Sequence, residues 1–155
     1  MILYFSATGN CQYAAERIAE ALGERAVSIL DAAEQNEPVS GIVTPTYALG
    51  LPQTMADYLN KHKITKKDKR LFFLAAYGTT PGQAAYFAAQ ALAKGSKLTF
   101  DAFYSVKTPD TWTPMFDLSD KDKVAALNEA ADKEITEIIK AINEGRTGNM
   151  MKHQL

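Results

Sequence analysis

Two short segments of this chain are apolar at every position, and each is followed by a glycine-containing loop and then by a helical pattern. The segments are residues 1–5 (MILYF) and 71–76 (LFFLAA). A strand with one face in solvent alternates polar and apolar residues, so unbroken runs of this length indicate strands buried on both faces. Such strands occur in parallel sheets that carry helices on each side. The pattern therefore predicts an α/β fold.

The rest of the chain repeats the order of strand and then helix. Three further strands are predicted, at residues 26–30, 39–44 and 98–106. Four helices are predicted: one up to Gly23, one after Pro52, one ending near Gly95, and one from an N-cap at Ser119 to Gly145. We expect one doubly wound domain with a five-stranded parallel sheet over residues 1–145. The polar tail, residues 146–155, is expected to be loosely ordered.

Length and composition exclude several classes of protein. The 155 residues suit one domain, and 46% hydrophobic with 23% charged residues argues against a disordered chain, a collagen or a coiled coil. A net charge of −1 gives no support to nucleic-acid binding, and a single cysteine excludes an internal disulfide and a multi-cysteine metal site. There is no signal-peptide pattern and no apolar run near the roughly 20 residues that span a bilayer. We expect a cytoplasmic protein with no membrane partner.

Right-handed crossovers place all the loops that follow strands at one pole of the sheet, where ligands of such folds bind. The loops are residues 6–11, 45–52, 77–82 and 107–118. The two histidines, His62 and His153, lie outside all four loops, and no paired carboxylates or metal-ligand spacing is visible. We therefore assign no catalytic side chain and no metal ligand, and expect any chemistry to belong to a cofactor.

The first loop, Ser6-Ala7-Thr8-Gly9-Asn10-Cys11, joins a buried strand to the start of a helix. The unpaired N–H groups and the positive dipole end of a helix N-terminus attract anions. Ser6 and Thr8 add hydroxyl groups, and Gly9 lets the backbone approach a ligand closely. The loop has no lysine, unlike a P-loop, and one glycine, unlike the dinucleotide fingerprint. It predicts a phosphate site built from neutral donors.

The run Ser6-Ala7-Thr8-Gly9-Asn10 resembles the phosphate loop of flavodoxins, which reads Thr/Ser-x-Thr-Gly-x-Thr after the first strand. The segments 45–52 and 76–82 are similar to the second and third FMN loops of that family. The phrases YFSATGN, PTY and YGTTPG resemble most the flavodoxin-like half of EFR1-type, ferredoxin-fused proteins. Those proteins carry a cysteine-rich cluster domain as well, whereas Cys11 is the single cysteine here. We therefore expect a stand-alone flavin domain.

The resemblance implies a flavodoxin-like three-layer sandwich with sheet order 2-1-3-4-5 and a noncovalently bound FMN. It implies that the first loop, including Ala7, Asn10 and Cys11, wraps the FMN phosphate. The implied contacts in the other two loops are Pro45, Thr46, Tyr47, Ala48, Leu49, Gly50, Tyr77, Gly78, Thr79 and Gly82. Among these, Tyr47 and Tyr77 are expected to contact the ring. The amides of Gly50 and Gly78 are expected to donate to ring oxygens.

Trp112, the single tryptophan, lies in the fourth loop. Three roles stay open for it: capping the ring, lining a substrate cleft, or packing on the last helix.

The leading hypothesis is a redox protein that transfers electrons through FMN to a partner protein or to a small-molecule acceptor. The alternative is an FMN-dependent NAD(P)H reductase of a quinone or a flavin. Electron-carrier flavodoxins are typically acidic, whereas the net charge of this chain is close to zero. The charge is therefore also compatible with the NAD(P)H reductase. A third possibility is a domain that keeps the fold but binds a partner protein. The basic run 61–70 is expected at the opposite pole, as a solvated segment or as a docking patch.

Cys11 and Arg17 fit the C-x5-R spacing of cysteine phosphatases, in which a thiolate attacks a phosphate held by the arginine. We reject that reading because the five residues between them favour a helix and include no glycine. Arg17 should then point to solvent, and the residue directly after the strand is Ser6. Thiol pKa values tend to fall at helix N-termini. A redox role for Cys11 therefore stays open beside the favoured one, a small residue in place of threonine.

Overall fold

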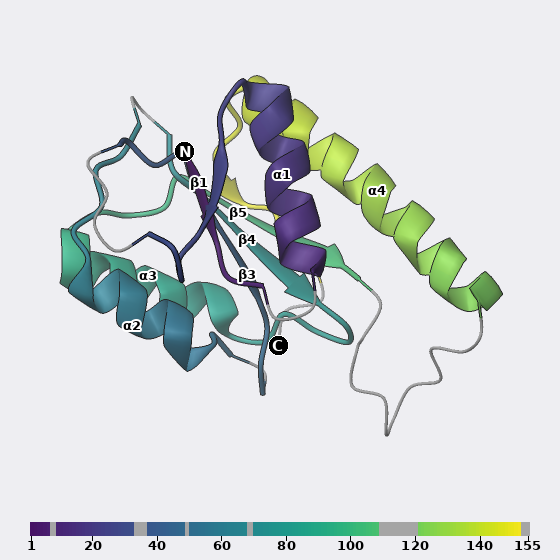
Figure 1. The fold of residues 1–155 in the computed structure, drawn as a ribbon, viewed down its shortest axis with the longest axis horizontal. Helices are drawn as coiled ribbons and strands as arrows, with labels where there is room; N and C mark the ends of the chain where they lie inside the picture. The colour runs from purple at the N-terminus through teal and green to yellow at the C-terminus, as the bar shows by residue number, and fades with distance from the viewer. Residues whose placement is uncertain (7–8, 33–36, 49, 68–69, 109–120, 153–155) are drawn as a thin grey trace.

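The computed structural model describes residues 1–6, 9–32, 37–48, 50–67, 70–108 and 121–152, without the side chains of 121–127 (Figure 1). The strands are β1 (Ile2–Tyr4), β2 (Ala26–Ser28), β3 (Gly41–Pro45), β4 (Phe72–Tyr77), β5 (Ala102–Lys107) and β6 (Gly148–Asn149). The helices are α1 (Asn10–Leu22), α2 (Gln53–Lys61), α3 (Ala84–Ser96) and α4 (Lys121–Asn143). The expected N-cap Ser119 lies outside the described residues. No helix within them is long and apolar enough to cross a membrane.

The strands form one parallel sheet in the order β2-β1-β3-β4-β5-β6. The predicted parallel α/β fold and the order of its five strands are confirmed. β1 lies between β2 and β3, and Leu3 is paired with Val27 on one side and with Ile42 on the other. Both faces of this central strand are buried, with Ile2 in one core and Leu3 in the other, which explains why the first residues of the chain are apolar throughout.

The prediction of a loosely ordered tail from residue 146 was wrong for the segment next to β5. Gly148 and Asn149 form β6, and Met150 donates its N–H to the Phe103 carbonyl oxygen at 2.8 Å. The N–H of Lys152 then donates to the Ser105 hydroxyl at 2.8 Å. An edge strand such as β5 presents unpaired backbone groups, and a short polar segment can pair with them without an apolar side-chain pattern.

Helices cover both faces of the sheet, α1 and α4 on one and α2 and α3 on the other (Figure 1). Adjacent residues of β4 serve the two cores: Phe73 packs beneath α2 and α3, and Phe72 faces α1 and α4. Gly41 makes room for Phe72, because a Cβ at residue 41 would lie 2.1 Å from the phenylalanine ring. All six residues of β4 are buried, as its unbroken apolar sequence predicts.

The amino ends of the strands and the ends of the helices form the amino pole, where the described part of the basic run, residues 61–67 and 70, lies as expected. Lys66 forms an ion pair with Asp101 at 2.6 Å, and Lys67 lies 3.4 Å from a Glu24 oxygen. His62 caps the end of α2 and stacks on Tyr58, with ring centroids 4.2 Å apart. Part of the basic run is thus paired within the protein.

Candidate functional site

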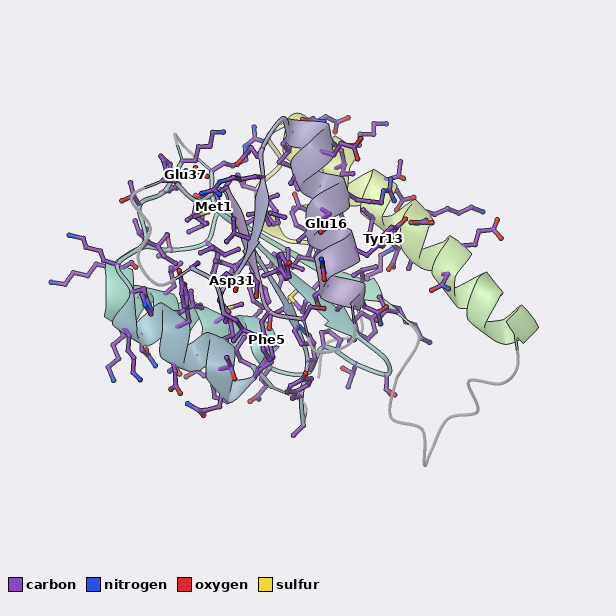
Figure 2. All side chains as sticks on the ribbon, in the orientation of Figure 1. Met1, Phe5, Tyr13, Glu16, Asp31 and Glu37 are labelled. Carbon is purple, nitrogen blue, oxygen red and sulfur yellow. The ribbon has the colours of Figure 1, made fainter. Side chains whose placement is uncertain are left out.

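The opposite end of the sheet, the carboxyl pole, carries the loops that follow β1, β3 and β4. Figure 2 shows Met1 and Glu37 toward one end of the sheet and Phe5, directly after β1, toward the other. The chain leaves β1 for α1 on one face and leaves β3 for α2 on the other. Adjacent strands whose connections diverge in this way form the crevice where ligands of doubly wound sheets bind.

The structure brings the first and second predicted loops together across this crevice. The rings of Phe5 and Tyr47 meet edge to face, with centroids 6.3 Å apart. Tyr47 remains 43% exposed. Burial raises the pKa of Tyr47, and the nearby Cys11 thiol adds to the rise. Tyr47 therefore lies between the start of α1 and open solvent, where a stacking partner can reach it.

The start of α1 has the chemistry expected of an anion site. Its N-cap is Gly9, at φ 96°, and no side-chain hydrogen bond caps this end in the described residues. The N–H of Gly9 donates to the Ser6 hydroxyl oxygen at 3.0 Å, and the hydroxyl hydrogen of Ser6 has no acceptor among the described residues. The first turn contains no acidic residue. Asn10 is half-buried in this turn, and Ala7 and Thr8 lie outside the described residues.

Cys11 and Arg17 do not face a common site. Cys11 is 2% exposed, and burial raises its pKa to about 12. The Arg17 guanidinium lies 3.1 Å from an Asp132 oxygen and donates to the Thr136 hydroxyl at 3.2 Å, both on α4. The expectation that Arg17 points to solvent was wrong, because α4 supplies its partners. A neutral, buried thiol and a remote arginine support rejection of the phosphatase reading.

The second loop is a tight turn closed by its own backbone. Tyr47 and Gly50 exchange N–H to carbonyl hydrogen bonds at 2.9 and 2.8 Å, with Ala48 at φ 48° between them. The Gly50 N–H therefore already has an acceptor, which argues against its predicted donation to a ring oxygen. Pro45 ends β3, and Leu49 lies outside the described residues.

Thr46 follows β3 and holds one of two buried side-chain oxygens that lack a hydrogen-bond partner among the described residues, the other being the Tyr104 hydroxyl on β5. Its N–H donates to the Ala76 carbonyl oxygen at 3.0 Å, which fixes the residue against the end of β4. Its hydroxyl oxygen is buried and has no hydrogen-bond partner among the described residues. Because such groups are nearly always satisfied, this hydroxyl marks a position suited to a bound ligand. The residues present thus fit a polar cofactor.

The third loop departs from the prediction at its first residue. Tyr77 is the last residue of β4 and is only 3% exposed, and its carbonyl oxygen accepts the Thr108 N–H at 2.9 Å. Burial raises the pKa of Tyr77, and the Glu134 carboxylate raises it further. Gly78 is half-buried and Thr79 is exposed. The structure therefore presents Tyr77 as a core residue.

The end of this loop turns into α3. Gly82 has φ 53°, and its N–H donates to the Thr80 hydroxyl at 3.1 Å. Trp112 lies outside the described residues, so its three possible roles stay open.

Comparison with known proteins decides the family. The sequence profile described as a flavodoxin domain matches residues 1–137. The chain belongs to the flavodoxin domain family. A solved structure named as a flavone reductase has a TM-score of 0.45 and 13% sequence identity to this chain. That likeness covers 96% of this chain and 65% of the other, so the chain spans less than two thirds of the reductase. The comparison with curated proteins finds no match.

Two residues near the carboxyl pole of this flavodoxin domain were not singled out from the sequence. Glu134 on α4 accepts the Lys107 N–H at 3.0 Å, at the end of β5. Phe87 on α3 lies against the second loop, since a Cβ at Gly50 would be 3.5 Å from its ring. Neither contact has a local signal, because each depends on how a helix packs on a distant loop. No cluster that could hold a metal occurs among the residues the structure describes.

Proposed function

We propose that this flavodoxin domain binds FMN noncovalently at the carboxyl pole and transfers electrons through it. The buried Thr46 hydroxyl, which has no partner among the described residues, carries the proposal, because it lies in the second loop, whose Tyr47 packs against Phe5 directly before the first loop. When bound, FMN supplies a ring that accepts and releases electrons. The protein binds and orients that ring.

The phosphate would be held by the start of α1. Ser6 offers its hydroxyl hydrogen and Gly9 a close backbone approach, with the positive end of the helix dipole behind them. Thr8 is the third proposed contact. No lysine or arginine lies in the loop, so neutral donors would carry the interaction.

The ring would lie against Tyr47, with the Thr46 hydroxyl bonded to one of its polar atoms. Because the Gly50 N–H is already bound to Tyr47, Gly78 is the remaining glycine proposed to approach the ring oxygens. Neither the segment 45–52 nor the segment 77–82 contains a charged residue. Such surroundings disfavour added negative charge on the ring and so influence its potential.

The test is the binding of FMN against that of riboflavin, which has the same ring without the phosphate. The purified protein should take up FMN on titration, and riboflavin should bind roughly a hundredfold more weakly if two or three phosphate hydrogen bonds are lost. A folded protein that binds neither compound would overturn the proposal. Equal affinities would contradict the role given to the first loop.

A second assay separates an electron carrier from a reductase. The FMN-loaded protein is mixed with NADH or NADPH and with a quinone or free flavin as acceptor. Turnover of the nicotinamide would show the NAD(P)H reductase. Its absence, with reduction by a protein donor retained, would favour the carrier that we propose.

A further inference from the structure

The Tyr104 hydroxyl is the second buried side-chain oxygen with no hydrogen-bond partner among the described residues. Tyr104 is 3% exposed and belongs to the core beneath α1 and α4. Its ring meets the ring of Phe72 edge to face, and Phe72 is paired with Ala102, nearer the amino end of β5. The tyrosine ring therefore leans toward that end. Because buried hydroxyl groups nearly always have a partner, this one marks a second position suited to a ligand.

Two guanidinium groups lie near this hydroxyl. Burial raises the pKa of Tyr104, and the positive charges of Arg70 and Arg146 offset part of that rise. The two arginines meet where α4 ends, since a Cβ at Gly145 would lie 3.1 Å from an Arg70 guanidinium nitrogen and Arg146 is the next residue. The fold thus brings together three polar groups from separate parts of the chain: before β4, on β5 and after α4.

These groups lack an acceptor. The Arg70 side chain is half-buried and forms no ion pair or hydrogen bond with the residues that the structure describes. Arg146 lies 3.0 Å from a Glu144 oxygen through its Nε, which leaves the other N–H groups of its guanidinium. Carbonyl oxygens at the end of α4 already accept the N–H groups of Gly145 and Arg146. Arginine only donates and a phenol hydroxyl can donate, so the missing partner is an acceptor.

The same place has room for a ligand. Tyr104 and Arg146 line a cleft of about 260 Å³ between α4 and the segment after β6. Its apolar lining consists of Ile138, Ala141 and Met150. One water molecule occupies about 30 Å³ of liquid, so the cleft can hold a small anion together with several waters.

Two carboxylates also line this cleft, away from the arginines. Glu134 is held at the carboxyl end of β5, where it accepts the Lys107 N–H at 3.0 Å, whereas the Tyr104 ring leans the other way. Glu137 is exposed, so water and salt screen its charge. The end of the cleft beside Arg146 is therefore its positively charged end.

We propose that Arg70, Tyr104 and Arg146 form a binding site for a small oxyanion, a phosphate or carboxylate group, at the end of α4. The oxyanion accepts hydrogen bonds from the Tyr104 hydroxyl and from both guanidinium groups, whose planar donors suit phosphate and carboxylate oxygens. The site lies at the edge of the sheet, where β6 pairs with β5. It is separate from the first loop and does not rest on the binding of FMN there.

Amide NMR spectra of the protein titrated with inorganic phosphate, at an ionic strength held constant with sodium chloride, test the proposal. The signals of Arg70, Gly145 and Arg146 should shift and saturate, with a dissociation constant on the order of a millimolar. Acetate is titrated in the same way. Saturation by both anions would indicate a general oxyanion site, and saturation by phosphate alone a phosphate site. Shifts confined to Gly9 and Asn10 would place the phosphate at the first loop and overturn the proposal.

Two variants with matched controls measure the contributions of the side chains. Tyr104→Phe removes only the hydroxyl and should weaken phosphate binding about fivefold, whereas Tyr86→Phe, at an exposed tyrosine of α3, should leave it unchanged. Arg70→Gln should weaken binding roughly tenfold or more, because hydrogen bonds from charged groups are stronger. Arg25→Gln removes the same charge from an exposed arginine before β2 and should change the affinity by less than about twofold.

Urea unfolding of the same variants separates binding from a purely structural role, since a cation at the end of a helix also stabilises it. If Arg70→Gln lowered the free energy of unfolding and left phosphate affinity unchanged, the arginine would have that role alone and the proposal would be overturned. Wild-type signals that do not move up to about 20 mM phosphate would overturn it too. Equal phosphate affinities of Tyr104→Phe and Tyr86→Phe would do the same.

Discussion

The two poles of the sheet satisfy their polar groups in opposite ways. At the amino pole, the Glu24 carboxylate accepts hydrogen bonds from the N-terminal ammonium, at 2.5 Å, and from the Ser40 hydroxyl. Asp101 pairs with Lys66 and also accepts the Leu71 N–H at 2.9 Å. At the carboxyl pole, the Thr46 hydroxyl is buried with no partner in the described structure. One pole is closed by its own side chains, and the other leaves polar groups for a ligand.

This difference separates stability from binding. Substitutions at the amino pole break contacts that the folded chain already makes, so they should lower the free energy of unfolding. Substitutions at the carboxyl pole remove groups that await a ligand, so they should change affinity with little effect on stability. The predictions below test this division from the largest expected effect to the smallest.

Cys11 tests whether the carboxyl pole holds a reactive nucleophile. With a pKa of about 12, its thiol at pH 8 should be ionised roughly a thousandfold less than a free cysteine, and burial slows attack further. Iodoacetamide labelling, followed by mass spectrometry, should therefore be slow in buffer and fast in denaturant. Any adduct reports on this residue, because the chain has one cysteine. Fast labelling of the native protein would contradict the buried, neutral state of this thiol.

Gly95 tests close packing near the amino pole, where α2 and α3 end side by side. A Cβ at this position would lie 1.9 Å from the Leu59 carbonyl oxygen. Alanine normally stabilises a helix relative to glycine by about 1 kcal/mol. Here the backbone clash outweighs that gain, so Gly95→Ala should destabilise by about 3 kcal/mol.

Urea unfolding measures this change, with Ala93→Gly as the control on the same helix. Ala93 is exposed, so its substitution should cost only the helix propensity of about 1 kcal/mol. If Gly95→Ala were as stable as the wild type, the two helices would not be in the contact described.

Glu24 tests the charged network of the amino pole. Burial alone would raise its pKa, but hydrogen bonds from the N-terminal ammonium and Ser40, with the charges of that ammonium and Lys67, outweigh this and lower it. Glu24→Gln should therefore destabilise the protein by about 2 kcal/mol at neutral pH. Because the pKa is lower in the folded state, this stabilisation is present above the unfolded pKa and is lost as the pH falls through the folded value.

Urea unfolding at several pH values checks both parts of this prediction. The difference between wild type and Glu24→Gln should shrink below about pH 4. Glu20→Gln, at an exposed position one turn earlier in α1, should change stability by less than about 0.5 kcal/mol. A pH-independent difference at Glu24 would contradict the charge network.

Most of the fold could be predicted because it depends on patterns local in sequence. Two examples are the unbroken apolar run of β4 and the buried stripe of α4, which includes Ile135, Ile138 and Ile142. Both patterns are visible in the order of apolar residues along the sequence. β6 was missed because a two-residue edge strand is held by backbone hydrogen bonds and needs no apolar residue. The partners of Arg17 were missed because they come from α4, more than a hundred residues away.

The candidate site was predictable at the level of loops and less so at the level of atoms. Topology alone places the loops after β1 and β3 side by side. The hydrogen bond from the Gly50 N–H to the Tyr47 carbonyl oxygen accompanies a turn in which Ala48 adopts φ 48°. The sequence does not indicate this left-handed conformation, because residue 48 is alanine and not glycine. The predicted third loop begins at Tyr77, whereas β4 ends there. Because of this difference of one residue, Tyr77 is a buried strand residue in the structure and not an exposed loop residue.

Thr46→Val is the smallest expected effect and the sharpest test of the carboxyl pole. Valine has the shape of threonine without the hydroxyl, so removing a buried oxygen that has no partner among the described residues should leave the free energy of unfolding unchanged or slightly higher. FMN affinity should fall roughly fivefold to tenfold, the value of one hydrogen bond of about 1 kcal/mol. Thr65→Val, at an exposed position of the amino pole, is the matched control and should leave the affinity unchanged. Fluorescence titration with FMN and urea unfolding of the same samples give both quantities. A loss of stability without a loss of affinity would place Thr46 with the residues of the amino pole, as part of the protein's own framework, and the division between the poles would fail at the residue that defines it.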